Sequence, residues 1–394
     1  MKKAEIILDE PSIIAQADPS IRRWGPFQFP SIERLADGRL HCRYHIEDDT
    51  AAAYGKAPGN AVSPDEGKTW EPSGLAARQG LLLPNGDRIS AANMTAAVPE
   101  KSELPPKRIC ETLLNSGRVS CYDPDEIPAR YGGYYLARRK AGTDEWVNER
   151  HDFHIPFSVR IYYHNAGGLL PYRGFSRIRL APDATVWGLI YEYTWYEGNA
   201  RMAASFVTSD DNGYHWSFRS TIFYKPDFED RYWATRTGYT EPDIAFLPDG
   251  SLACLLRTDD SFHQGPSYIC YSIDGGYTWT DPVRFDDLGV WPCFLSLKCG
   301  VTLAGYGRPG LFLRASADPA GKEWSGRTTV VPVTVSSEVL HLWGEQDTTC
   351  SYCDMMALSD DTFYLVYSDF NVPNADGAPC KTILGRRGTV RIVE

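Results

Sequence analysis

Short apolar stretches alternate with tight polar turns along the chain. Residues 32–40 read IERLADGRL and residues 244–252 read IAFLPDGSL, so apolar residues lie on both sides of an Asp-Gly pair. Asp-Gly supplies the positive φ angles of a tight hairpin, so both segments predict a strand, a turn and a second strand. Six such turns follow one another: Asp37-Gly38, Asn85-Gly86, Asp183-Ala184, Asp249-Gly250, Cys299-Gly300 and Asp360-Asp361. The pattern predicts an all-β fold of six repeated units.

A second repeat occurs at its own spacing. Residues 63–70, 209–216 and 272–279 read Ser-x-Asp-x-Gly-x-x-Trp, and residues 316–324 hold a fourth copy with one extra residue. In a hairpin the serine and aspartate bond turn amides, glycine takes a conformation that other residues resist, and tryptophan packs onto the sheet. These segments predict structural turns rather than a reactive site.

With this Asp-box pattern, the chain resembles the sialidase (neuraminidase) superfamily of propellers, whose members carry such BNR repeats, over nearly its whole length. The resemblance implies a single six-bladed β-propeller of four-stranded antiparallel blades over residues 1–394, with the boxes at the blade periphery. Residues 90–160 lack a clear box and hold proline-rich and charged stretches. We therefore expect an irregular second blade with an insertion there.

Composition narrows the range of partners. A net charge of −11 argues against binding to nucleic acid or to an anionic membrane surface. No apolar run of signal-peptide or membrane-span length occurs, so the sequence predicts a cytoplasmic protein. Ten scattered cysteines are expected to be mostly reduced core residues, and the CxxC pair at 350–353 lacks partners for a zinc site. No metal or cofactor is predicted.

The resemblance implies a carboxylate-binding site. Sialidases hold a substrate carboxylate with three arginines, because a guanidinium presents paired donors and keeps its charge. Arg257 and Arg308 match two of these positions, whereas the first arginine motif reads Phe-Gln-Phe-Pro, with Gln28 in place of arginine. Glutamine donates a hydrogen bond but carries no charge. Arg23 lies nearby in the sequence, either as a replacement or as a surface residue.

The resemblance also implies a tyrosine nucleophile. Tyr352 matches the family's tyrosine and Glu241 the glutamate that takes its proton; a neutral phenol avoids the repulsion that a carboxylate nucleophile would meet beside a substrate carboxylate. Asp48 and Asp49, in the acidic loop 44–50, are the candidates for the acid/base residue. Each candidate also has a structural interpretation: Glu241 as a surface residue, Arg257 paired with Asp259 or Asp260, Arg308 as an inter-blade salt bridge, and Tyr352 as core.

These residues favour a glycoside hydrolase that acts on a terminal, carboxylate-bearing sugar. Two alternatives remain: a polysaccharide lyase acting on uronate glycans, and a propeller that binds carbohydrate without catalysis. Residues 191–193, expected to end a strand, are further candidates for lining the pocket. A carbohydrate is the expected partner in each case, and the sequence does not indicate an oligomeric state.

Overall fold

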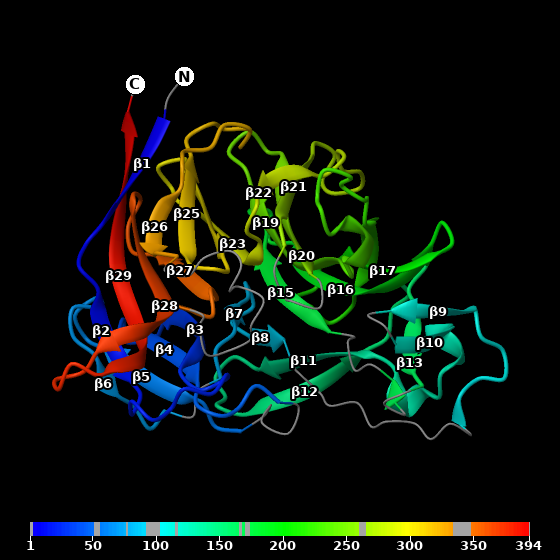
Figure 1. Cartoon of the computed structure of the whole chain (residues 1–394), viewed down its shortest axis with the longest axis horizontal. Helices are drawn as coiled ribbons and strands as arrows, with labels where there is room; N and C mark the ends of the chain where they lie inside the picture. The colour runs from blue at the N-terminus through cyan, green and yellow to red at the C-terminus, as the bar shows by residue number, and fades with distance from the viewer. Residues whose placement is uncertain are drawn as a thin grey trace. The chain divides into compact units, whose positions relative to one another are not determined.

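A computed structural model describes residues 3–50, 56–75, 78–91, 103–114, 117–164, 168–169, 174–259, 265–333 and 348–393. Within these ranges the regular structure is β-strand (Figure 1), apart from short 3-10 turns such as Pro124–Glu126, Ala129–Tyr131 and Trp233–Thr235. The prediction of an all-β fold is confirmed. Across the described part of the chain, we find no helix with the length and apolar character needed to span a bilayer.

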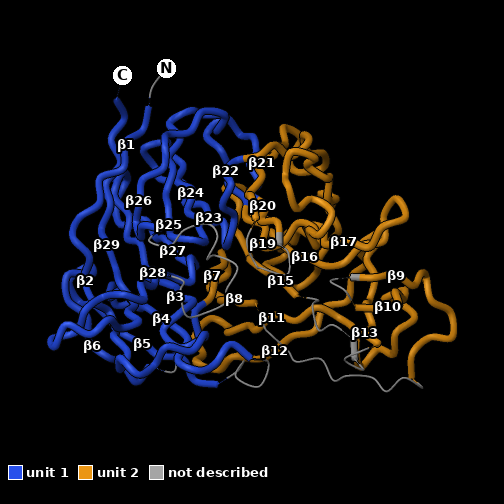
Figure 2. Tube along the Cα trace, in the orientation of Figure 1, with its two compact units in different colours: residues 1–79, 244–255, 285–394 blue, residues 80–243, 256–284 orange. Residues whose placement is uncertain are grey.

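The chain divides into two compact units (Figure 2). Unit 1 comprises residues 1–79, 244–255 and 285–394, and unit 2 comprises residues 80–243 and 256–284. The predicted single domain over residues 1–394 stays a prediction.

Unit 1 contains three antiparallel sheets in which consecutive strands are neighbours. The first holds β3 (Gln28–Arg34), β4 (Leu40–His45), β5 (Gly59–Ser63) and β6 (Glu71–Pro72). The second holds β23 (Val290–Ser296), β24 (Thr302–Gly307), β25 (Leu311–Ser316) and β26 (Thr328–Val331). The third holds β27 (Cys353–Ala357), β28 (Thr362–Pro373) and β29 (Pro379–Val393).

The third sheet also takes up the first two strands of the chain. β1 (Lys3–Leu8) and β2 (Ser12–Gln16) both pair antiparallel with β29, on the side opposite β28 (Figure 1). Inward-facing residues of β24, β25 and β28, such as Leu303, Leu313 and Leu365, are fully buried in one hydrophobic cluster. Strands from both ends of the chain therefore stabilise the same sheet.

Unit 2 begins with two sheets that interrupt one another. β7 (Leu81–Leu82) and β8 (Arg88–Ala91) pair with β11 (Tyr134–Arg139) and β12 (Trp146–His151). Between β8 and β11 the chain forms β9 (Cys110–Leu114) and β10 (Gly117–Tyr122), which join β13 (Arg160–Tyr163) and β14 (Gly168–Leu169) in a separate sheet. This excursion falls in the segment where the sequence predicts an insertion; its assignment to an irregular blade stays a prediction.

The remaining sheet is the largest. It contains β15 (Phe175–Leu180), β16 (Val186–Tyr196), β17 (Asn199–Ser209) and β18 (Ser217–Ile222), followed by β19 (Gly238–Phe246), β20 (Leu252–Asp259), β21 (Ser267–Ser272) and β22 (Val283–Asp286). β17 and β19 run parallel and pair at Met202 and Gly238, whereas β15, β16, β17 and β18 pair antiparallel in that order.

The six turns noted in the sequence all close hairpins. They join β3 to β4, β7 to β8, β15 to β16, β19 to β20, β23 to β24 and β27 to β28. In the first, the amide of Gly38 bonds the carbonyl of Leu35 at 3.0 Å, and Gly250 bonds Leu247 in the same way at 2.9 Å. The strand-turn-strand predictions are confirmed, while their assembly into six blades stays a prediction.

The Ser-x-Asp segments form the turn hydrogen bonds expected of them. Ser63 Oγ donates to Asp65 Oδ1 at 2.9 Å and accepts from the amide of Gly67 at 2.7 Å. Trp70 Nε1 donates to Tyr364 Oη at 3.0 Å, and that hydroxyl donates to the Gly67 carbonyl at 2.8 Å. Because Tyr364 lies on β28, this turn fastens the first sheet of unit 1 to the third.

Two glycines of unit 1 allow this contact to be tested. Gly38 and Gly67 have φ of 89° and 87°, so alanine is strained equally at both; a Cβ has open space at Gly38 but would lie 2.0 Å from Tyr364 Cε2 at Gly67. We expect Gly38→Ala to lower the free energy of unfolding by about 1 kcal/mol and Gly67→Ala by about 3 kcal/mol, measured by urea denaturation. Equal losses of unfolding free energy in the two variants would show that the Tyr364 ring moves aside at no cost in stability.

Candidate functional site

The first strands of the unit 1 sheets share a local irregularity. Phe29 in β3 and Trp291 in β23 have φ of 53° and 49°, and Ser351, just before β27, has φ of 63°. The strand register also shifts near Phe29 and near Trp291. Such bulges break the alternation of side chains and redirect them, and strained backbone of this kind is concentrated at functional sites.

Aromatic contacts bring these three strands to Tyr352. Its ring stacks on Trp291 with centroids 4.6 Å apart and an interplanar angle of 24°. Phe29 meets the same ring edge-on at 4.8 Å. Tyr352 is partly exposed, in contrast to the core tyrosines Tyr306 and Tyr364. The ring is therefore fixed by its neighbours while part of it still faces solvent.

Arg308 lies beside Tyr352. It occupies the turn between β24 and β25, is 6% exposed, and donates from Nη2 to the carbonyl of Cys350 at 2.7 Å. Its guanidinium carbon is 5.0 Å from the ring centroid of Trp24 and 5.8 Å from that of Tyr352. No carboxylate of the described residues forms an ion pair with Arg308, so no inter-sheet salt bridge is seen. The cation is held by rings and a carbonyl, which leaves donors for a ligand.

Gln28 begins β3 next to this cluster. The side chain is fully buried, and within the described ranges neither its amide oxygen nor its amide nitrogen has a hydrogen-bond partner. His45 lies opposite in the register, and burial lowers the pKa of its imidazole despite the nearby carboxylates of Asp49 and Glu47. Position 28 therefore brings no charge to the site.

The acidic loop after β4 lies against the loop that carries Trp24. Asp49 Oδ2 accepts a hydrogen bond from Trp24 Nε1 at 3.0 Å. Asp48 forms an ion pair with Arg23, and both of these side chains are more than half exposed. Arg23 is therefore engaged at the surface, as the structural interpretation predicted. Of the two aspartates, Asp49 is the one linked to the residues around Arg308.

Glu241 and Arg257 lie in unit 2 and contact each other directly. Arg257 Nη1 donates to Glu241 Oε1 at 2.8 Å, and both side chains are buried. Glu241 has φ of 47°, so β19 carries the same kind of irregularity as β3 and β23. Asp243 follows Glu241 by two residues on β19. Arg179 donates two hydrogen bonds to its carboxylate, of 2.8 and 2.6 Å.

One of the structural interpretations can now be judged from this pair. Glu241 is not a surface residue, so that interpretation is wrong. Arg257 pairs with Glu241, whereas the side chains of residues 259 and 260 lie outside the described part of the chain. One guanidinium nitrogen of Arg257 is therefore already bound to a protein carboxylate, which reduces what this arginine can offer a ligand.

Residues 191–193 do not end a strand. β16 continues to Tyr196 because it pairs along its whole length with β17 in a long hairpin. Glu192 is buried in this strand, and its Oε2 accepts a hydrogen bond from Tyr134 Oη at 2.9 Å. The expected strand end is therefore wrong, and the long pairing with β17 is its physical reason.

The cysteines form no disulfide. All ten are free and most are buried. Cys350 Sγ lies 3.0 Å from Ser368 Oγ, and Cys353 Sγ lies 3.4 Å from Cys293 Sγ, so the two members of the CxxC pair have different neighbours. Over the described ranges, no group of three or more His, Cys, Asp or Glu side chains is arranged to hold a metal ion.

Comparison with known proteins extends the description of the fold. A solved protein of unknown function from Dyadobacter fermentans has a TM-score of 0.64 at 18% identity, over 98% of this chain and 99% of that one. An α-L-arabinanase from Penicillium chrysogenum, solved with arabinobiose, has a TM-score of 0.50 at 12% identity, over 96% and 98%. The fold is similar to that of β-propeller glycosidases.

A sialidase is also among the similar structures. The Hadza microbial sialidase Hz136 has a TM-score of 0.48 at 15% identity, and the match covers 90% of this chain and 65% of that one. A scan against protein-family models finds no match, and a search of curated proteins finds none either.

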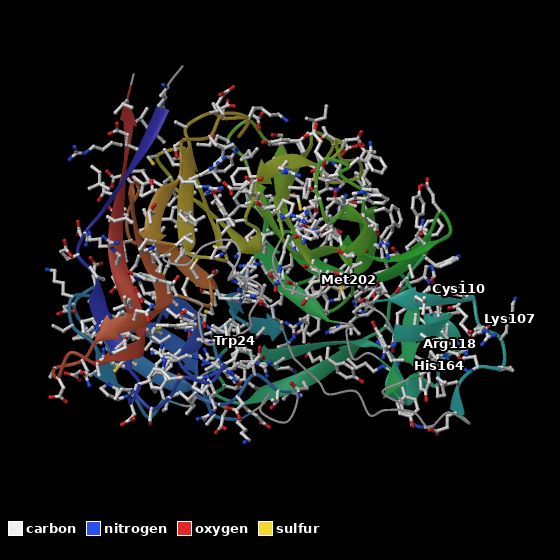
Figure 3. The ribbon with its side chains drawn as sticks, in the orientation of Figure 1. Trp24, Lys107, Cys110, Arg118, His164 and Met202 are labelled. Carbon is white, nitrogen blue, oxygen red and sulfur yellow. The ribbon has the colours of Figure 1, made fainter. Side chains whose placement is uncertain are left out.

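The unit 1 cluster comprises Trp24, Phe29, Trp291, Arg308 and Tyr352. Sequence reasoning missed three residues in or next to this cluster. Trp24 (labelled in Figure 3) and Trp291 supply its aromatic rings. Lys381 is buried, and its Nζ donates to the carbonyl of Arg23, the residue before Trp24. No motif marks them. The available signal was weak: Trp24 lies four residues before Gln28, and Trp291 lies near the start of β23, one strand before the β24 strand that leads into the Arg308 turn.

Proposed function

We propose that this protein is an exo-glycoside hydrolase that releases a terminal, carboxylate-bearing sugar from an oligosaccharide, with Tyr352 as its nucleophile. The observation that supports this most directly is the position of Arg308, a buried cation held against the ring of a partly exposed tyrosine. The proposal includes a six-bladed propeller with Asp boxes, which the six hairpins and the turns bonded by serine and aspartate support.

The proposed reaction has two steps. Tyr352 Oη bonds the anomeric carbon while the glycosidic C–O bond breaks, a general base takes the phenol proton, and Asp49 gives a proton to the leaving oxygen. The resemblance to sialidases gives the role of that base to Glu241. Water then attacks the anomeric carbon and gives a proton to Asp49. The bond to Tyr352 breaks, and the base returns its proton to the phenol. The sugar leaves with its original anomeric configuration.

Three features of the unit 1 cluster suit this role. The stack on Trp291 and the edge contact with Phe29 fix the ring of Tyr352, which keeps the nucleophile oriented. Arg308 provides a positive charge for the substrate carboxylate and for the phenolate that develops during attack. Trp24 is partly exposed and offers an aromatic surface beside that charge.

The proposal assigns unequal roles to the carboxylate-binding residues. Arg308 makes the main contact in unit 1, because Gln28 is uncharged. Arg257, the further arginine that the resemblance implies, is bound to Glu241. A hydrogen bond to a charged group is worth about 1.5–3 kcal/mol and a neutral one about 1 kcal/mol. We therefore expect this site to hold a sugar carboxylate less tightly than three free arginines would.

A panel of fluorogenic substrates tests the proposal. Purified protein is assayed with a sialic-acid α-ketoside, several uronides and neutral glycosides, beside the Arg308→Met variant. We expect turnover of an acidic sugar, and a loss of kcat/KM of about 100-fold or more in the variant, since a charge-assisted carboxylate contact is removed. Turnover of the neutral glycosides alone would overturn the carboxylate assignment. A product that absorbs through a new double bond would favour the lyase, and binding without turnover a carbohydrate-binding propeller.

A further inference from the structure

A buried lysine lies behind the aromatic cluster. Lys381, on β29, is 1% exposed. Its Nζ donates to the carbonyl oxygen of Arg23 and, at 3.5 Å, to that of Pro26. The ammonium group also lies 4.5 Å from the ring centroid of Phe370. Burying an ammonium group carries a large desolvation cost, so a chain retains one only where its contacts compensate.

Both acceptor carbonyls belong to the loop that carries Trp24. They lie on either side of Trp24 in the sequence, so one ammonium group holds the loop before and after this residue. Phe370, which the ammonium group contacts, meets the Trp24 ring edge-on at 6.3 Å. Lys381 thus contacts both the backbone of the loop and the ring on which Trp24 rests.

The loop is also pressed against the acidic loop. Gly25 has φ of 111°, and a Cβ there would lie 2.4 Å from the amide nitrogen of Asp49. Only glycine allows this approach, which places Trp24 Nε1 at 3.0 Å from Asp49 Oδ2. Lys381 constrains the same loop through the carbonyl oxygens of Arg23 and Pro26. The position of Trp24 over Arg308 therefore depends on contacts made on both sides of its loop.

We propose that Lys381 is a positioning residue for the sugar site: it holds the loop of residues 23–26 so that Trp24 lies against Arg308. The proposal rests on the proposed function in one respect, because the site it positions is the one assigned there to the terminal sugar. Lys381 does not touch the sugar. It acts through the loop carbonyls and through Phe370.

Hydrogen exchange of the whole protein tests the positioning directly. Lys381→Met keeps the length of the side chain and removes its three donors. We expect the backbone amides of residues 23–25 and 27 to exchange at least tenfold faster in this variant; Pro26 has no amide hydrogen. Arg327→Met is the matched control, because it removes another cation of unit 1 that pairs with Asp286; these amides should exchange as in the wild type. Unchanged exchange in Lys381→Met would overturn the proposal.

Kinetics provide the second measurement. On the sugar that the wild type hydrolyses fastest, Lys381→Met should raise KM at least fivefold and leave kcat within twofold, whereas Arg327→Met should change neither. A fivefold or larger fall in kcat with KM unchanged would contradict a positioning role in binding. If Lys381→Met does not fold, Lys381→Gln, which keeps one donor group, should give an intermediate rise in exchange. Faster exchange without turnover of any sugar would uphold the positioning and refute the hydrolase.

Discussion

Tyr352→Phe is expected to lower kcat by about 10³-fold or more on every sugar that the wild type hydrolyses, because it removes the atom that bonds the anomeric carbon. The ring contacts with Trp291 and Phe29 involve no hydroxyl group, so the variant should fold and bind substrate as the wild type does. KM should therefore change little. Initial rates and the thermal unfolding midpoint measure the two effects separately.

The control for this experiment is Tyr44→Phe. Tyr44 is also partly exposed in unit 1 and packs on Phe27 at 5.5 Å, but the proposal gives it no chemical role. Its kcat should stay within twofold of the wild type. A fluorinated substrate that forms the glycosyl-enzyme and releases it slowly should add one sugar mass to the peptide containing Tyr352. An adduct on another residue, or an active Tyr352→Phe protein, would refute the tyrosine mechanism.

Asp286→Asn is expected to lower the free energy of unfolding by about 3 kcal/mol, because it breaks a charge network inside unit 1. The buried carboxylate accepts hydrogen bonds from Tyr306 Oη at 2.7 Å, from Arg314 Nη2 at 2.8 Å and from Arg327 Nε at 2.9 Å. Asparagine keeps the shape but leaves two guanidinium groups without their counter-charge. The loss stays near the lower end for buried pairs, since Arg314 and Arg327 are partly exposed and water can reach them.

Urea denaturation measures this loss, with Asp376→Asn as the control. Asp376 is an exposed residue in the turn between β28 and β29. The same substitution there should change the free energy of unfolding by about 0.5 kcal/mol at most. If Asp286→Asn were equally harmless, the arginines would find other partners or water at no cost, and the network would not stabilise the sheet.

The hairpins were predictable because their cause is local. An Asp-Gly pair determines a turn whatever surrounds it, and Ser63 reaches its partners Asp65 and Gly67 within four residues. The pairing of β10 with β13 was not predictable in this way. Cys121 lies opposite Ile161, forty residues later in the chain, and no short pattern records that contact.

The candidate site shows the same division. Tyr352, Arg308 and Gln28 could be selected from motifs, and all three lie in unit 1, where Arg308 contacts the ring of Tyr352 and Gln28 precedes Phe29, which contacts the same ring. The pairing of Arg257 with Glu241 could not be read from the sequence, because it depends on how β19 and β20 present their side chains. The burial of Lys381 could not be predicted from the sequence, because a lysine in a strand normally extends its amine to solvent and only tertiary packing buries this one.

The pairing of β1 and β2 with β29 has a consequence for synthesis on the ribosome. The first strands leave the ribosome hundreds of residues before their partner exists, so their amide and carbonyl groups stay available to other chains during that interval. Synthesis of β29 removes that exposure by completing the sheet. A chain truncated before β29 would lack the partner for β1, β2 and β28 at once and would leave all three open to pairing with other chains.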